Sequence, residues 1–180
     1  MNPNSMTPVD WAKRPILEKY ADFSGRAPRP ELWWYVLALV VAAIIVSVIE
    51  SILGLHHMIV GMYGPLSALL WLGTIVPSIA VAVRRLHDVN RPGWWVLLPL
   101  VPECLMIVMA LTTAGAVAAG GGMAAAMGGL ALTGLLGLIT LVGAIILIVF
   151  YVMPGTPGDN RYGPNPYGGV TPDGTAIPAE

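Results

Sequence analysis

Residues 32–55 read LWWYVLALVVAAIIVSVIESILGL, a run of 24 residues in which Glu50 is the only charged side chain. Helical residues rise about 1.5 Å each, so this run would extend about 36 Å and would cross a hydrocarbon core of about 30 Å. We therefore predict a transmembrane helix. Glu50 falls about one turn from the end of the run, where the simplest interpretation is an interfacial carboxylate that reaches water.

Three further apolar stretches follow, at about residues 66–83, 94–111 and 130–152, and each is long enough to span a membrane. Between the last two, residues 112–129 hold only Ala, Gly, Met, Thr and Val. This segment can form an outer loop, or it can extend the third helix as a tightly packed face of small residues. The predicted fold class is all-α: a polytopic membrane protein with four transmembrane helices.

The distribution of basic residues predicts the orientation of these helices. All nine Lys and Arg residues fall before the first stretch, between the second and third, or after the fourth: Lys13, Arg14, Lys19, Arg26, Arg29, Arg84, Arg85, Arg91 and Arg161. Cytoplasmic loops carry the Lys/Arg excess, so both termini are predicted to be cytoplasmic. The expected organisation is a cytoplasmic segment at 1–31, a transmembrane domain at 32–153, and an irregular, mobile, Pro/Gly-rich cytoplasmic tail at 154–180.

The composition supports a membrane protein and excludes other classes. The chain is 56% hydrophobic and 11% charged, whereas an average soluble domain is about 25% charged. Its basic residues are too few, and too tied to orientation, to indicate a nucleic-acid partner. Cys104 is the single cysteine, which excludes an intramolecular disulfide and a multi-cysteine metal site. The side chains of the adjacent His56 and His57 diverge on most backbones, so we expect neither a metal nor a cofactor.

The first candidate binding cluster follows the second apolar stretch and holds Arg84, Arg85, His87, Asp88 and Arg91. If the helix continues past residue 83, four of these residues share one face at spacings of three and four. Arg84 can then pair with Asp88, and guanidinium groups around the His87 imidazole can bind a phosphate or a carboxylate. The alternative is that the arginines only set orientation and anchor lipid headgroups, which explains His87 and Asp88 less well.

Two other polar segments, residues 23–31 and 154–166, are expected at the same membrane level. The first can reach the cluster, or it is simply a rigid approach to the membrane with internal ion pairs. The second is rich in glycine but lacks the spacing of a nucleotide-binding loop, so it is more simply a turn-rich cap that folds against the other segments. These segments add five candidate residues: Arg26, Arg29, Glu31, Asn160 and Arg161.

Glu103 is a separate candidate, because its depth depends on where the third helix starts. If that helix begins at Trp94, Glu103 lies about 13 Å deep, near the bilayer centre. Ionisable groups at that depth are functional by default, so a role in transport or proton transfer would follow. Alternatively, Pro99 and Pro102 break the stretch, residues 94–98 lie in the interface, and Glu103 lies near a helix start.

The three polar segments resemble the bacterial domain-of-unknown-function family 805. Its pattern F-x-G-R-A-x-R-x-E-x-W is matched by residues 23–33, R-R-L-H-D-x-x-R-x-G-W-W by 84–95, and P-G-T-x-G-x-N-R-Y-G-x-N-P by 154–166. The resemblance implies a multi-pass protein of the bacterial inner (plasma) membrane and supplies no reaction. Residues 96–153 are more than the family usually has between its second and third motifs, and we predict that the addition makes two full spans.

Three hypotheses for the function remain. The leading one is a non-enzymatic membrane module that binds anionic lipid headgroups or a protein partner through the cytoplasmic cluster. The second is a small transporter or channel component that uses Glu103 and works as a homo-oligomer. The third is an enzyme acting on a lipid or phosphate headgroup with His87 and Asp88, although no nucleophile with a base and an orienting group is evident.

Overall fold

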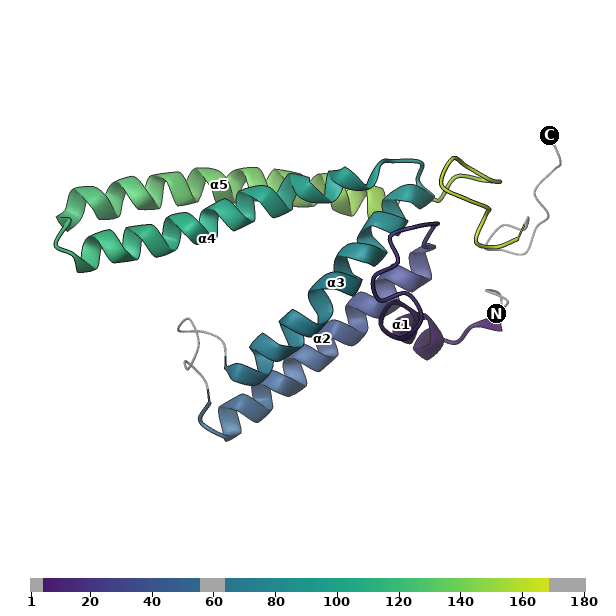
Figure 1. Cartoon of the computed structure of the whole chain (residues 1–180), viewed down its shortest axis with the longest axis horizontal. Coiled ribbons are helices and arrows are strands. Elements are labelled where there is room, and N and C mark those ends of the chain that lie inside the picture. The colour runs from purple at the N-terminus through teal and green to yellow at the C-terminus, as the bar shows by residue number, and fades with distance from the viewer. Residues whose placement is uncertain (1–4, 56–63, 169–180) are drawn as a thin grey trace. The chain divides into compact units, whose positions relative to one another are not determined.

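The computed structural model describes residues 5–55 and 64–168, and within these ranges the chain forms helices and turns without a named strand (Figure 1). The elements are α1 (Pro8–Leu17), α2 (Arg29–Ile52), α3 (Pro65–Asp88), the 3-10 helix η2 (Gly93–Val96), α4 (Leu97–Ala118) and α5 (Gly122–Val152). His56, His57 and the end of the tail lie outside the described residues, so the expectations about them stay predictions.

Four segments of the described chain have the length and composition to cross a membrane: α2, α3, η2 with α4, and α5. This confirms the predicted number of spans and the all-α class. α2 has the predicted length of 24 residues, shifted toward the N-terminus, whereas α3, α4 and α5 are longer than predicted. α3 continues past residue 83 to Asp88, which places four of the five residues of the first candidate cluster on its last turns, while Arg91 lies beyond the end of the helix.

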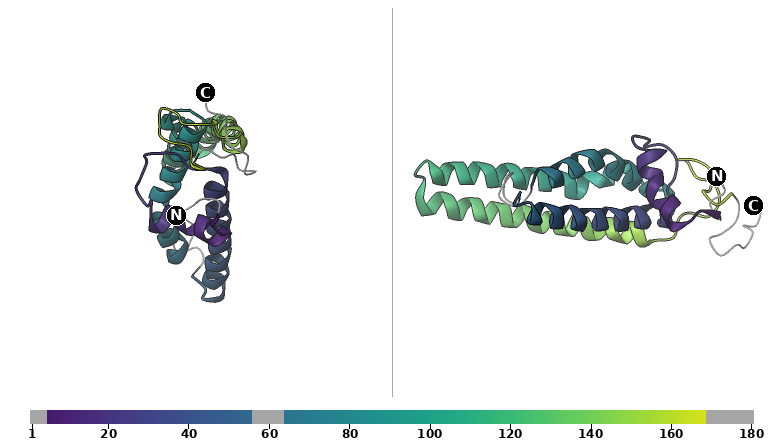
Figure 2. Two further views of the ribbon diagram at one scale, coloured as in Figure 1. Left: turned by 90° about the vertical axis from the view of Figure 1, so that its right-hand side faces the viewer. Right: turned by 90° about the horizontal axis from the view of Figure 1, so that it is seen from below.

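The chain divides into two compact units, and the first comprises residues 1–93 with 153–180. In this unit α2 and α3 run side by side, and the short helix α1 packs against both (Figure 2). The Tyr35 hydroxyl of α2 lies 2.9 Å from the Ser78 Oγ of α3, which ties the two spans together. Most remaining apolar side chains on the spans face outward, as expected of helices whose solvent is lipid.

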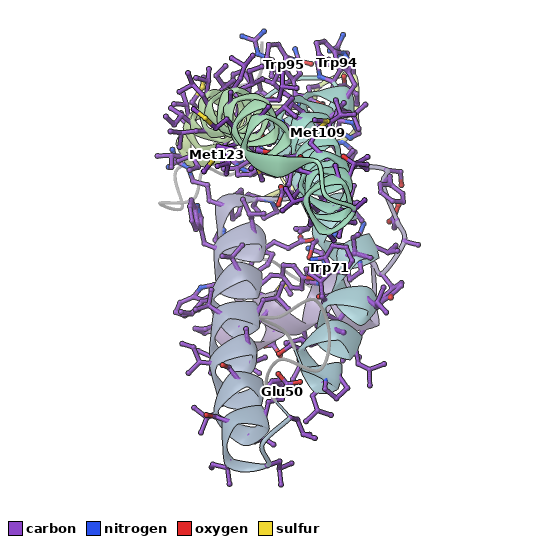
Figure 3. The ribbon with its side chains drawn as sticks, turned by 90° about the vertical axis from the view of Figure 1, so that its left-hand side faces the viewer. Glu50, Trp71, Trp94, Trp95, Met109 and Met123 are labelled. Carbon is purple, nitrogen blue, oxygen red and sulfur yellow. The ribbon has the colours of Figure 1, made fainter. Side chains whose placement is uncertain are left out.

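Glu50, in the last turn of α2, is fully buried, so the expectation that it reaches water is wrong. Its side chain points between α2 and α3 (Figure 3), where Oε1 accepts a hydrogen bond from Ser67 N at 2.9 Å and Oε2 accepts one from Ser67 Oγ at 2.5 Å. The first N–H groups of a helix have no partner inside the helix. Glu50 therefore serves as a cap for α3, supplied by the preceding span.

The second unit, residues 94–152, contains the α4–α5 hairpin, and it resolves the two interpretations of residues 112–129. Residues 112–118 extend α4, residues 119–121 form the connecting turn, and residues 122–129 belong to α5, so each alternative describes only part of the segment. The helices approach closely: a Cβ added to Gly129 would lie 2.1 Å from Thr113 Oγ1. Small residues permit such close packing of membrane helices.

Glu103 lies in the second turn of α4, a helix that runs through Pro99 and Pro102 without a break, so the depth of Glu103 in the membrane stays a prediction. Trp94 belongs to the 3-10 turn η2, and α4 begins at Leu97 with Pro102 inside its second turn. The 3-10 turn and α4 together form one candidate span, Gly93–Ala118, which begins one residue before Trp94. Glu103 is exposed on α4 within this unit.

Candidate functional site

Five charged side chains are buried at the polar end of the first unit, and we call them the juxtamembrane cluster: Arg26, Glu31, Arg84, Arg85 and Asp88. They come from the approach to α2, from the first turn of α2 and from the last turns of α3. Burying a charge is costly unless it is paired and hydrogen-bonded. The ion pairs of these five side chains therefore explain how the cluster can be buried.

Asp88 is the centre of the first ion-pair group. Its Oδ1 accepts a hydrogen bond from Arg26 Nε at 2.9 Å, and its Oδ2 accepts one from Arg85 Nη1. Arg26 also donates through Nη1 to Gly158 O and through Nη2 to Thr156 O, both at 2.6 Å. One guanidinium thus joins the approach to α2, the end of α3 and the tail.

Glu31 is the centre of the second group. It is fully buried, and it accepts hydrogen bonds from Arg84 Nη1 and, at 3.1 Å, from Arg14 Nη1 of α1. The predicted Arg84–Asp88 pair is therefore wrong. Arg84 pairs with Glu31 of α2, and Arg85 pairs with Asp88, three residues later on α3. Arg84 Nε and Nη2 are buried without a hydrogen-bond partner among the described residues.

His87 lies beside the cluster and is not surrounded by guanidinium groups, so that expectation is also wrong. Its ring stacks on Tyr162, with centroids 3.9 Å apart, and its Nδ1 lies 3.2 Å from Gly25 O. The carbonyl can only accept, which places the proton of a neutral ring on Nδ1. The arginines converge on Asp88 instead, so the anion at the centre of the site is the protein's own carboxylate.

The tail segment caps the end of α3, as the simpler of its two interpretations predicted. Thr156 N donates to Asp88 O at 2.8 Å, and Asn160 Nδ2 donates to His87 O at 2.9 Å. The last carbonyls of a helix lack partners within it, and these bonds supply them. A Cβ added to Gly155 would lie 2.3 Å from Asp88 Oδ2, so the backbone approaches the carboxylate too closely for a side chain.

Two predicted site residues stay at the surface. Arg161 is exposed, its Nη2 donates to Asn90 O at 3.3 Å, and its guanidinium lies 4.7 Å from the Tyr162 ring centroid. Arg91 is also exposed, and its backbone N–H donates to Leu86 O at 2.8 Å. Neither side chain belongs to the buried cluster.

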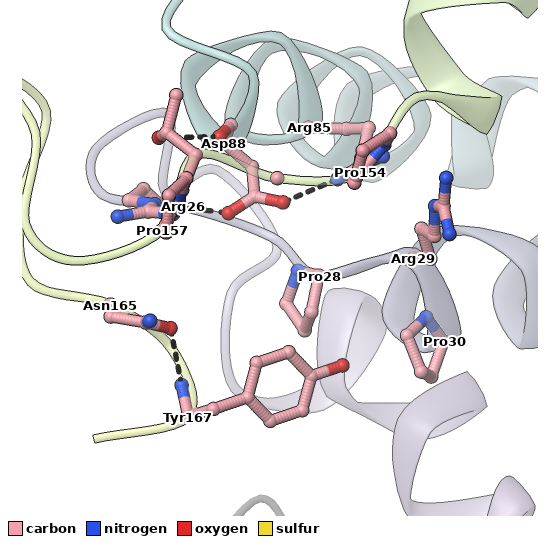
Figure 4. Close-up of a pocket in the computed structure, with 12 residues that line it drawn as sticks. Arg26, Pro28, Arg29, Pro30, Arg85, Asp88, Pro154, Pro157, Asn165 and Tyr167 are labelled. Carbon is pink, nitrogen blue, oxygen red and sulfur yellow. Dashed lines mark hydrogen bonds and ion pairs between the residues drawn. The ribbon is translucent and has the colours of Figure 1, made fainter. Parts of the chain in front are cut away.

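A cavity of about 470 Å³ opens beside the cluster, and we call it the arginine–proline pocket (Figure 4). Its lining includes three cluster residues, Arg29 and four prolines: Arg26, Arg29, Arg85, Asp88, Pro28, Pro30, Pro154 and Pro157, with Gly155, Thr156, Asn165 and Tyr167. Arg29 Nε donates to Met153 O at 3.1 Å, and Arg85 Nη2 donates to the same carbonyl. The two guanidinium groups therefore lie next to each other at the pocket.

Tyr167 is a lining residue that the sequence analysis missed. Burial raises the pKa of its phenol, and nearby Asp88 raises the pKa further, while Arg85 and Arg29 act in the opposite direction. The phenol therefore stays protonated at neutral pH and can donate a hydrogen bond. No spacing rule marks Tyr167, because it lies just after the third motif and reaches the pocket only through the fold.

Known proteins match this chain over most of its length. The model of the family described as "Protein of unknown function (DUF805)" matches residues 20–164. Inner membrane protein YhaH of Escherichia coli K12 is 29% identical over 158 residues, 88% of this chain and 97% of that protein. Inner membrane protein YhaI of the same strain is 33% identical over 151 residues, 84% of this chain and 91% of that protein. No solved structure gives a significant match.

Proposed function

The chain belongs to the DUF805 family, and from this premise we propose that it is a non-enzymatic membrane module that binds the phosphate of an anionic lipid headgroup in the arginine–proline pocket. It is an integral inner membrane protein with four helices able to cross the bilayer. The observation that carries the proposal is the convergence of three guanidinium groups and one carboxylate on that pocket.

The charge of the pocket favours an anion. Arg26, Arg29 and Arg85 contribute three positive charges and Asp88 one negative charge, so the lining has a formal charge of +2. Charges in partly buried surroundings are screened less than exposed ones, and the attraction for a phosphate is correspondingly stronger. Arginine also matches the geometry of phosphate oxygens, to which it donates in pairs.

The position of the pocket favours a lipid headgroup over a soluble anion. Arg29 is the first residue of α2, and the candidate span begins at the same residue. Its exposed side chain therefore lies at the level where the chain enters the membrane. Anionic lipids of the cytoplasmic leaflet present their phosphates at this level to juxtamembrane basic residues. The prolines add a stiff wall without N–H donors.

Binding of a headgroup without acyl chains tests the pocket directly. We expect the full chain in detergent to bind glycerol phosphate in isothermal titration calorimetry, and the affinity to fall as salt is raised. Arg29→Gln should weaken binding about tenfold, equivalent to about 1.4 kcal/mol for one charge-assisted contact. The matched control is Arg161→Gln, which removes the same charge from an exposed residue outside the pocket.

Equal weakening by both substitutions would indicate general attraction by the basic surface and would contradict a site. A second comparison separates a lipid from free phosphate. Native mass spectrometry should show that Arg29→Gln retains one phosphatidylglycerol molecule fewer than the wild-type chain. If inorganic phosphate binds as tightly as glycerol phosphate and Arg29→Gln retains as many phosphatidylglycerol molecules as the wild-type chain, the ligand is a soluble anion and the lipid proposal is wrong.

The two alternative functions gain less support from the geometry of the described residues. Glu103 is exposed on α4, and Glu50 is engaged by Ser67, so neither carboxylate adds weight to the transporter hypothesis. His87 Nδ1 faces the Gly25 carbonyl while both oxygens of Asp88 accept from guanidinium groups. Among the described residues, no hydrogen bond therefore joins His87 to Asp88, so the two do not form the imidazole–carboxylate pair that the enzyme hypothesis requires.

A further inference from the structure

A second cavity, of about 600 Å³, lies in the first unit between α1 and the middle of α2, and we call it the α1–α2 groove. Its wall on α1 runs along one face from Pro8 to Leu17, and its wall on α2 runs along one face from Trp34 to Ile45. The residues of both walls recur at spacings of three and four, as one side of a helix requires. Lys13 is the charged residue of this otherwise apolar lining.

The groove stays open because α1 is fixed in its orientation. Trp11 and Pro15 are buried on the opposite side of α1, and Arg14 is tied to Glu31 of α2. α1 therefore cannot rotate to cover its other apolar residues, and Leu17 remains 73% exposed. An amphipathic helix at the membrane surface normally buries such a face at the boundary between headgroups and acyl chains.

The length of the groove matches one leaflet. The α2 wall covers eleven residue steps from Trp34 to Ile45, about 16 Å at the helical rise. The hydrocarbon core of a bilayer is about 30 Å thick, so the groove is about as long as one leaflet is deep. Ala12 on α1 and Ala38 and Ala42 on α2 leave space within the groove because their side chains are small.

The charge of the groove indicates which lipid it takes. Lys13 is exposed on the lining and belongs to α1, the helix that precedes the first span. Each basic residue near an anionic leaflet adds to the attraction for its phosphates. We infer that the α1–α2 groove holds one acyl chain of an anionic phospholipid, with the phosphate beside Lys13. This site is separate from the arginine–proline pocket and does not depend on it.

Matched substitutions on α2 test the apolar part of this inference. Ala38 lines the groove, whereas Ala43 is exposed on the same helix outside it. Phosphatidylglycerol is titrated into detergent-purified full chains that carry Arg29→Gln, so that the arginine–proline pocket does not contribute, and the bound lipid is counted by native mass spectrometry. Ala38→Phe should weaken binding about tenfold, because several methylene groups lose their apolar contacts. Ala43→Phe should leave the affinity unchanged. Equal affinities for the two variants would overturn the inference.

Substitution of Lys13 tests the inference that the lipid in the groove is anionic. Lys13→Gln should bring the affinity for phosphatidylglycerol close to that for phosphatidylcholine, while Lys19→Gln, which removes a lysine paired with Asp22, should preserve the preference. If the wild-type chain binds both lipids equally, the inference of an anionic ligand is wrong.

Glycerol phosphate binding should survive Ala38→Phe, which shows that the variant is folded and separates failure of the groove from failure of the pocket. Ala42→Phe, on the same wall, serves as a second blocking variant.

Discussion

Asp88 shows at the scale of one residue why the candidate site is also a structural element. The carboxylate is 3% exposed, and it lies between the buried guanidinium groups of Arg26 and Arg85. Removing one member of a buried ion pair leaves its partner's charge uncompensated in a poorly solvated place. Here a single substitution would leave two such charges, and it would also weaken the link between three chain segments.

We therefore predict that Asp88→Asn lowers the free energy of unfolding by about 3–5 kcal/mol, the cost of breaking a buried pair. The control is Glu18→Gln, which removes a carboxylate that is 55% exposed and lies 3.6 Å from Arg14. An exposed pair one helical turn apart is worth about 0.3–0.5 kcal/mol. Unfolding of both detergent-purified variants in sodium dodecyl sulfate measures the difference. Similar shifts for the two variants would show that Asp88 does not hold the cluster together.

Side-chain partners were the part of the site that sequence reasoning predicted least well. Spacing along α3 predicted that Arg84 pairs with Asp88, yet Arg84 pairs with Glu31, which is 53 residues earlier. The spacing rule compares only residues on one helix, and it carries no information on what the neighbouring helix presents. The two carboxylates of the cluster could be chosen from the sequence because membrane insertion did not require Glu31 or Asp88.

At the scale of elements, the ends of helices explain most of the polar contacts. Glu50 supplies the cap of α3 from the preceding span, and Thr156 and Asn160 supply the cap at its other end. Both caps come from residues outside α3, so local sequence signals for helix ends could not reveal them. They satisfy backbone groups that lipid could not hydrogen-bond.

The α4–α5 hairpin offers a prediction at the same scale. Gly129→Ala should destabilise the second unit, because the new Cβ would lie 2.3 Å from Thr113 Cγ2. Its neighbour Gly128 has open space around the position of a Cβ, so Gly128→Ala should be neutral or stabilise the helix by up to about 1 kcal/mol. Thermal denaturation of the two variants provides the comparison. A loss of stability in Gly128→Ala but not in Gly129→Ala would contradict the close packing.

At the scale of the whole molecule, three segments that are far apart in sequence meet because each lies at the end of a membrane helix. Arg26 contacts Asp88 across 62 residues and Thr156 across 130. The distribution of basic residues was enough to predict that these segments share one side of the membrane. This prediction needs only the hydropathy and the Lys/Arg content of each segment, which do not depend on contacts between segments. The two cavities were not predictable in this way, because their walls combine residues from separate helices.

The orientation itself remains a prediction, and labelling of single cysteines can test it. In a Cys104→Ala background, which removes the exposed native thiol, cysteines are introduced at Ser24, Gly121 and Asp159, all exposed. The basic residues precede the first span, separate the second from the third, and follow the fourth. A membrane-impermeant maleimide should therefore label Gly121→Cys in intact spheroplasts, and should label Ser24→Cys and Asp159→Cys only after lysis.

Labelling of Asp159→Cys in intact spheroplasts would mean that α4 and α5 do not both cross, and it would place the tail on the opposite side from Arg26. The tail could not then cap α3, so the same result would contradict the pocket.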